Sequence, residues 1–108
     1  MTKEQEVYNY LIENCKGKKN LVKNKYLMEM FEIKSDKSMR KIIQNIREDK
    51  QFTEVIGSVS GKSGGNYICT NDQEIQETID NIKHRANQKL RMTHVLKLKK
   101  KLYNKTHR

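Results

Sequence analysis

Polar side chains that proteins use on nucleic acids are concentrated between residues 36 and 49. Arg and Lys can contact phosphates or guanine edges, Gln and Asn adenine edges, and Ser phosphates. If this segment is helical, at about 100° per residue, they lie opposite an apolar stripe that begins at Met39 and repeats at i+3, i+4 and i+7. Every soluble helix has a polar outer face, so the pattern alone favours DNA only weakly. The candidate residues are Lys37, Ser38, Arg40, Lys41, Gln44 and Asn45.

A glycine-rich stretch, SGKSGG from Ser60 to Gly65, offers a second candidate contact. Its three glycines suit the positive φ angles of a hairpin tip. Lys62 and Ser63 would bring an ammonium group, a hydroxyl and backbone N–H groups to a phosphate, although a plain hairpin turn is the alternative. The glycine spacing is wrong for a P-loop, and no strand–loop–helix pattern surrounds it. Nucleotide binding through such a loop is therefore not expected.

Catalytic and metal-binding patterns are missing from the sequence. No Ser/His/Asp, Cys/His or carboxylate set has a recognisable spacing, and the three histidines all fall after residue 83. Cys15 and Cys69 are far apart and lack metal-ligand spacing, which favours two reduced thiols. We therefore expect a protein that is not an enzyme and that uses no cofactor or metal.

The positive charge is confined to one end of the chain. The formal net charge is +10, yet residues 1–82 hold thirteen Lys/Arg and thirteen Asp/Glu, and residues 83–108 hold ten Lys/Arg and no acid. Such a segment indicates a polyanionic partner, most often nucleic acid; an acidic protein surface, a membrane or a merely solvated tail are alternatives. Candidate contacts for nucleic acid or another partner are Lys83, Arg85, Lys89, Arg91, Lys97, Lys100 and Lys101.

Short elements are expected to position the candidate side chains. Ser35 or Asp36 is suited to cap the third helix, and Gly17 to end the first. Two short helices, a tight turn, a third helix and a ribbon make a winged helix-turn-helix, an α+β and mainly helical fold. The predicted helices are Glu4–Lys16, Lys23–Phe31 and Asp36–Asp49, and the predicted strands are Phe52–Val59 and Asn66–Thr70.

The last third of the chain predicts a long helix. Neither Gly nor Pro interrupts residues 73–104, which would span about 48 Å at 1.5 Å per residue, so the helix must overhang, bend or divide. We expect a core of residues 1–72, with residues 73–108 packed on it in their first half and overhanging in their basic second half. Ile75, Ile79, Ile82 and Ala86 form a first apolar stripe, which would pack on the core. A second stripe, rotated from it, favours a homodimer or a protein partner; the alternatives are a bend that folds both stripes onto one core, or a fraying end whose leucines contact little. That stripe is Met92, Val95, Leu96, Leu102 and Tyr103, and Lys99 interrupts it.

The segment from Met39 to Tyr67, with MRKIIQNIRED, a hydrophobic strand and GGNYICT, resembles small winged-helix proteins of bacteriophages and integrated mobile elements. The resemblance covers roughly Val7 to Leu90 and implies a DNA-binding regulator or a part of a replication module. Carried over by position, it assigns DNA contact to the third helix and to Lys62. Glu48 and Asp49 depart from the pattern, because carboxylates sit poorly against phosphates, and the family offers no role for the basic end.

Two functions of different class follow from these patterns. The first is a sequence-specific DNA-binding protein, a phage or mobile-element regulator or replication accessory protein, with the third helix in the major groove and the wing on the backbone. The alternative is a protein-interaction module, such as an antirepressor, a nuclease inhibitor or a replisome-loading factor. The start of the chain has no apolar signal region and the apolar runs are too short for a membrane span, so a cytoplasmic protein with no membrane contact is expected.

Overall fold

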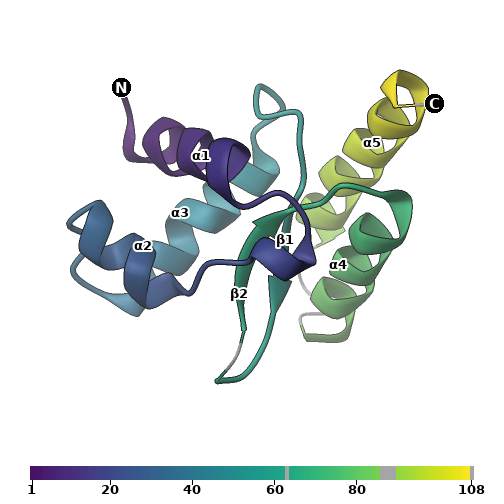
Figure 1. The fold of residues 1–108 in the computed structure, drawn as a ribbon. Coiled ribbons are helices and arrows are strands. Elements are labelled where there is room, and N and C mark those ends of the chain that lie inside the picture. Colours follow the sequence, from purple (N-terminus) through teal and green to yellow (C-terminus); the bar gives the residue numbers. More distant parts are fainter. Residues whose placement is uncertain (63, 86–89, 108) are drawn as a thin grey trace.

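The computed structural model describes residues 1–62, 64–85 and 90–107, with side chains at all of these except 85 and 90–93. The described chain is α+β: helices surround a two-stranded antiparallel hairpin (Figure 1). The elements in chain order are α1 (Lys3–Asn14), the 3₁₀ turn η1 (Lys18–Asn20), α2 (Asn24–Met30), α3 (Asp36–Glu48), β1 (Ile56–Val59), β2 (Gly65–Ile68), α4 (Asp72–Arg85) and α5 (Leu90–Thr106).

Local signals place the first three helices close to their predicted bounds. The α1 helix begins in a capping box, in which Thr2 Oγ1 accepts from the Gln5 N–H and the Gln5 side chain accepts from the Thr2 N–H. The predicted cap of α3 is confirmed at Ser35, whose Oγ accepts from the Ser38 N–H at 3.1 Å. Between α2 and α3 the chain turns through Glu32, which has a φ of 55°. The cap and the turn before it fix the residue at which α3 begins.

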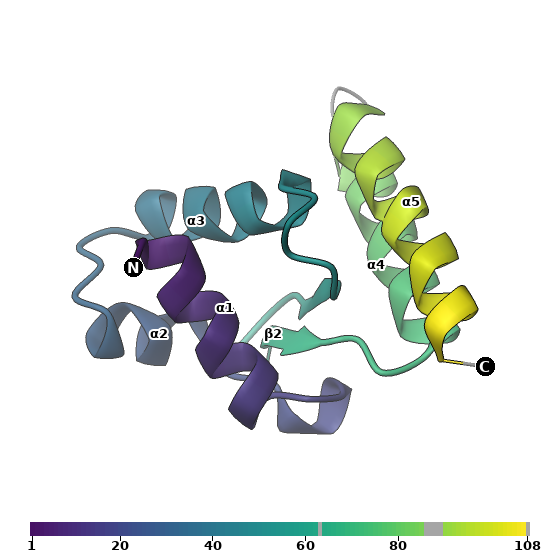
Figure 2. The same ribbon diagram turned by 90° about the horizontal axis from the view of Figure 1, so that it is seen from above.

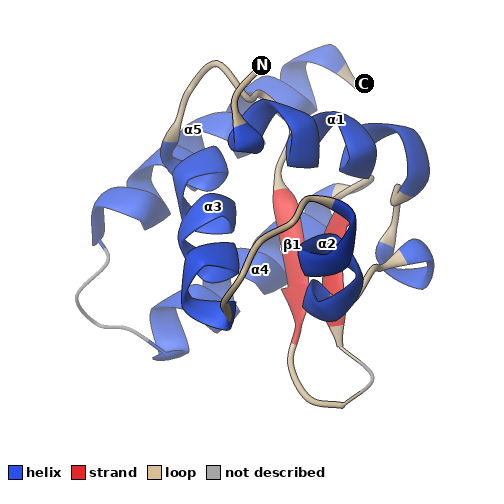
Figure 3. Ribbon diagram, turned by 90° about the vertical axis from the view of Figure 1, so that its left-hand side faces the viewer, coloured by secondary structure: helices blue, strands red, loops and turns tan. Residues whose placement is uncertain are grey.

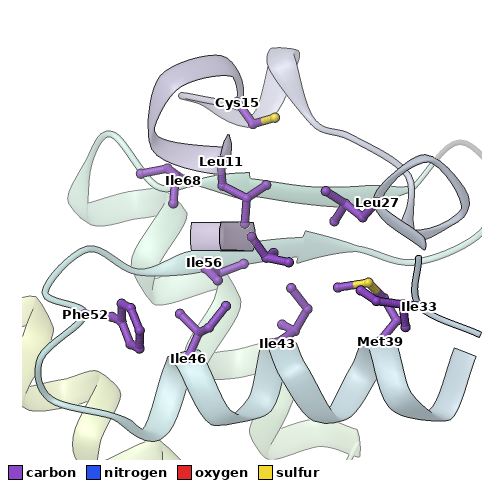
Figure 4. Close-up of a cluster of buried hydrophobic side chains, with 11 residues drawn as sticks. Leu11, Cys15, Leu27, Ile33, Met39, Ile43, Ile46, Phe52, Ile56 and Ile68 are labelled. Carbon is purple, nitrogen blue, oxygen red and sulfur yellow. The ribbon is translucent and has the colours of Figure 1, made fainter. Parts of the chain in front are cut away.

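The apolar stripe of α3 packs into the first of two hydrophobic clusters. Met39, Ile43 and Ile46 point from α3 towards α1, α2 and one face of the hairpin (Figure 4). Leu11 and Leu27 meet them from α1 and α2, and both are fully buried. The stripe therefore does what its spacing predicted, and it leaves the opposite side of α3 outside the core.

The hairpin is shorter at its start than the predicted strands. Ile56 pairs with Ile68 and Val59 with Gly65, and one further bond runs from the Cys69 N–H to the Val55 carbonyl, but the predicted strand residues before Val55 are not paired in the hairpin. Phe52 is buried with its ring centroid 4.8 Å from that of Tyr8, and the Glu54 N–H donates to the Tyr8 hydroxyl. The outer edge of β2 is paired with the connection between α1 and α2, through isolated bridges at Lys16 and Val22. Main-chain pairing thus ties the β2 edge of the hairpin to the segment between α1 and α2.

The prediction of a single long C-terminal helix is wrong, because the segment divides into α4 and α5. The two helices lie side by side as a helical hairpin, and the end of α3 meets α5 (Figure 2). Their apolar side chains form a second cluster on the other face of the β-hairpin, where Ile75, Ile79 and Leu96 pack with Val55 and Tyr67. The prediction that the second half overhangs is also wrong. The structure shows the alternative, in which both apolar stripes fold back onto one core.

The physical reason for the division is burial of apolar surface. In a straight helix of about 48 Å, one of the two apolar stripes would face water. The returning α5 buries Val95 and Leu96 instead. Within the described residues, no helix is long and apolar enough to cross a membrane.

A candidate nucleic-acid interface

The N-terminal half of α3 presents the positive side chains predicted there. Lys37, Arg40 and Lys41 are all exposed on its outer side. Ser38 is exposed as well, but it serves the helix cap, where Ser35 Oγ donates to its hydroxyl at 3.0 Å. An incoming phosphate would therefore meet three cations and a capping hydroxyl that is already hydrogen-bonded.

The C-terminal half of α3 is different, because its amides are held by carboxylates. Asn45 Nδ2 donates to Glu4 Oε2 of α1 at 3.0 Å, and Gln44 Nε2 donates to Glu48 Oε1 at 3.3 Å. Asp49 follows at the end of the helix. The six predicted residues do share one side of α3, but the structure separates them into a cationic half and an amide–carboxylate half.

A cleft of about 480 Å³ lies between α3 and the β-hairpin, and residues of α2 and α4 complete its walls. Figure 3 shows α3 running beside β1 with the hairpin tip projecting past α2. Four cationic residues line the cleft, and no carboxylate is among its described lining residues. These cations are Lys23, Arg40, Arg47 and Lys62.

Polar groups form the floor of this cleft, a feature that the sequence reasoning missed. Arg47 Nε donates to the Ile56 carbonyl at 2.9 Å and its Nη2 donates to Ser58 Oγ. Ser58 Oγ donates to Asn66 Oδ1 at 3.1 Å, and Asn66 Nδ2 donates to Asn24 Oδ1. The chain of bonds joins α3, β1, β2 and α2. Only the alternation of polar residues in the two strands hinted at it, because the four residues are distant in sequence.

The tip of the hairpin depends on glycine. Gly61 has a φ of 95°, a conformation that other residues rarely adopt. A Cβ at Gly64 would lie 1.9 Å from the Val59 carbonyl oxygen. Lys62 is exposed at this tip and reaches the mouth of the cleft, whereas the predicted contact Ser63 lies outside the described residues.

The basic residues of the C-terminal helices are only partly available. Lys83, Lys97 and Lys101 are exposed. Lys100 is half-buried, and its Nζ donates to Gln76 Oε1 at 2.7 Å and lies 3.7 Å from Asp72 Oδ2. Lys89 and the side chains of Arg85 and Arg91 lie outside the described part of the chain. The C-terminal end of α4 lies on the same side of the molecule as the hairpin tip (Figure 1), and Ile82 of α4 lines the cleft.

The predicted partner stripe on α5 is used inside the molecule. Leu96 is fully buried and Val95 is 7% exposed, so the prediction that they form a dimer or partner surface is wrong. Tyr103 is half-buried and its hydroxyl donates to the Thr70 carbonyl. Leu102 is 51% exposed, and the side chain of Met92 is not described. The residue that interrupts the stripe is itself 2% exposed: Lys99 Nζ donates to the Ile46 carbonyl, at the end of α3, at 3.2 Å.

The two cysteines are buried thiols whose pKa values are raised. Burial raises the pKa of the Cys69 thiol to about 12, so the thiol stays protonated and weakly nucleophilic at neutral pH. Burial also raises the pKa of Cys15. Among the described residues, no group of three or more His, Cys, Asp or Glu is placed to hold a metal ion. The arrangement is suited to binding an anion through charge and hydrogen bonds.

Comparison of the chain with known proteins finds no matching family model, no matching curated protein and no matching solved structure.

Proposed function

We propose that the chain is a DNA-binding protein built as a winged helix-turn-helix, in which α3 is the recognition helix and the β-hairpin is the wing. The single observation that carries the proposal is the run of cations along α3, the cleft and the hairpin tip, without a carboxylate among the described lining residues of the cleft. The order α1–α2–α3–hairpin and the exposure of the N-terminal half of α3 support it. DNA phosphates are bound mainly through such Arg and Lys side chains.

The division of α3 into two halves restricts how DNA would approach. Glu4, Glu48 and Asp49 would repel phosphates at the C-terminal half, so we expect α3 to enter the major groove by its N-terminal half. Lys62 would then lie on the backbone, and exposed lysines of the C-terminal helices, among them Lys83, would add non-specific affinity. The role of regulator or replication factor in a phage or mobile element is proposed from the resemblance alone.

The experiment is a fluorescence anisotropy titration of a labelled random duplex at several salt concentrations. If six to ten phosphates are contacted, affinity should fall about 10³–10⁵-fold between 50 and 200 mM salt. Lys37→Ala should weaken binding and reduce the slope of log K against log salt by about 0.9. Lys50→Ala is the matched control, since Lys50 is exposed beyond the opposite end of α3, about 20 Å away at 1.5 Å per residue.

Two results would contradict this proposal. The first is binding that does not depend on salt. The second is an equal loss for Lys37→Ala and Lys50→Ala, because the affinity would then arise from overall charge instead of from α3. Both variants change exposed residues, so their circular dichroism spectra and melting temperatures should match those of the wild type.

An exposed apolar pair on α2 favours a second candidate function, a protein-interaction module on the same scaffold. Tyr26 and Met30 lie one helical turn apart and are 57% and 45% exposed. A pull-down from a host lysate, repeated after nuclease treatment, separates the two functions. A partner retained after nuclease treatment, and lost in a Tyr26→Ser variant, would favour the protein-interaction module.

A further inference from the structure

The cleft between α3 and the hairpin has more room than a backbone phosphate requires. Its volume of about 480 Å³ lies within the range of roughly 300–1,000 Å³ that is usual for small-ligand pockets. We propose that it binds a phosphorylated small molecule of about mononucleotide size, whose phosphate is held by Lys23, Arg40 and Lys62. This site does not depend on DNA binding, and it goes beyond the proposed function.

The charge of the cleft selects an anion. Its cations come from separate elements: Lys23 precedes α2, Arg40 belongs to α3, and Lys62 lies at the hairpin tip. All three are exposed, so they can reorient onto a ligand at the mouth. Arg47 adds a fixed positive charge at the floor, where its guanidinium is bonded to Ile56 and Ser58. Several convergent cations from different elements are what a compact dianion such as a phosphate monoester requires.

The walls of the cleft suit the rest of such a ligand. Its polar lining includes Asn24, Ser58 and the buried Asn66, joined in one network. Its apolar lining includes Ile43, Val59 and Ile82 from three different elements. A few fixed polar groups among apolar side chains are typical of small-molecule sites, because the polar groups orient the ligand and the apolar side chains contact its rings.

The recess distinguishes this ligand from DNA. A duplex approaches α3 from outside and would place its phosphates on the exposed side chains, among them Arg40 and Lys62 at the rim. The floor network lies between α3 and the two strands, where Asn66 is 5% exposed. The absence of a P-loop pattern does not bear on the proposal, because the phosphate here is held by side chains from separate elements instead of by one glycine-rich loop.

The test uses the full chain and three probes: AMP, inorganic pyrophosphate and adenosine, which lacks the phosphate. Binding is measured by isothermal titration calorimetry at low salt. Lys23→Ala and Lys37→Ala form a matched pair, since both residues are exposed lysines but only Lys23 lines the cleft. Arg40→Ala removes the side chain that the cleft shares with the outer side of α3. Anisotropy with the labelled duplex is measured on the same proteins.

We expect AMP and pyrophosphate to bind, and adenosine to bind at least about 10-fold more weakly, since it cannot form the charged hydrogen bonds of a phosphate. Lys23→Ala should weaken AMP binding about 10-fold, and Lys37→Ala should leave it within about 2-fold. Arg40→Ala should weaken both AMP and the duplex.

The proposal is overturned if AMP and pyrophosphate do not bind at millimolar concentration, or if Lys23→Ala and Lys37→Ala weaken AMP equally. It is also overturned if Lys23→Ala weakens binding of the duplex but not of AMP, because the cleft would then bind the DNA backbone instead of a small molecule. Binding of AMP without any binding of DNA would instead refute the proposed function and leave this site standing.

Discussion

Replacing Lys99 by methionine should remove a pH dependence that a buried ammonium group gives to the stability of the fold. Lys99 is 2% exposed, and its Nζ donates to the Ile46 carbonyl oxygen at 3.2 Å. Burial lowers the pKa of Lys99 from 10.5 to about 8; the carboxylate of Asp49 opposes this shift and Arg47 adds to it. The folded chain therefore binds this proton less tightly than the unfolded chain does.

The sign and size of the effect follow from this difference. Between about pH 8 and pH 10.5 the unfolded state holds more protons on Lys99, so the free energy of unfolding rises with pH. At about 1.4 kcal/mol per pKa unit, the full gain is roughly 3 kcal/mol, of which roughly 2 kcal/mol should be present at pH 9.5. At neutral pH, Lys99→Met should change the free energy of unfolding by less than it does at pH 9.5, because removal of the buried charge offsets the loss of the hydrogen bond to the Ile46 carbonyl.

The assay is urea unfolding, followed by circular dichroism, of the wild type and of Lys99→Met from about pH 7 to pH 9.5. The quantity of interest is the difference between the two proteins at each pH. The buried thiol of Cys69, with its raised pKa, lowers stability above the ordinary thiol value of 9.0, but it does so in both proteins and cancels. Lys101→Met, which changes an exposed lysine two residues away, should keep the pH dependence of the wild type.

Parallel curves for the wild type and Lys99→Met would refute the reasoning. They would mean that the ammonium group keeps its water in the folded state, and therefore that α5 does not close over the end of α3. A loss of the pH dependence in Lys101→Met would refute it equally, because the effect would then come from overall charge. A small change in stability at neutral pH is expected and decides nothing.

Four further substitutions test the packing of α5, the cap of α3 and the hydrogen bonds of Glu74. Leu96→Ala should lower the free energy of unfolding by about 2–5 kcal/mol and Leu102→Ala by less than about 0.5 kcal/mol, since the first side chain is fully buried and the second is half exposed; equal values in urea unfolding would contradict the packing of α5. Ser35→Ala should cost about 1 kcal/mol in the same assay, because the α3 cap is lost, and an unchanged stability would rule out that cap. Glu74→Gln tests the stability at acidic pH. Burial alone would raise the pKa of Glu74, but hydrogen bonds from Thr70 and Lys18 lower it below its ordinary value of 4.5. The stability from Glu74 is present above about pH 4.5 and is lost as pH falls through the folded pKa, so melting temperatures of the variant should fall less steeply in acid; the same steepness in both proteins would exclude this role.

Sequence periodicity was sufficient for the elements that hold the candidate interface. The stripe from Met39 to Ile46, the cap at Ser35 and the glycines around Lys62 are local signals, and the structure confirms the elements they predicted. The start of β1 was predicted too early, because Phe52 is apolar enough for a strand yet is buried against Tyr8. Local propensity could not distinguish a Phe52 ring that is buried as part of a strand from one that is buried against Tyr8 before the strand begins.

Only part of the candidate site could be predicted from the sequence. Helical geometry placed six polar residues on the outer side of α3, but it could not show that Glu4 of α1 holds Asn45. Nor could it show that Ser58, Asn66 and Asn24 form the floor of a cleft, since these residues come from three different elements. Contacts between distant segments leave no periodic trace in a single sequence.

What the sequence by itself determined is therefore the helical pattern of the last third of the chain, its two apolar stripes and the one-signed charge of residues 83–108. Only the tertiary structure decided where those stripes go. Without Gly or Pro, local signals marked no break in this segment, and the choice between overhang and return depended on the free energy of burying Leu96 against a core formed by other elements. The return of α5 turned an expected partner surface into core, and the one lysine on that surface, Lys99, became a buried hydrogen-bond donor to the end of α3.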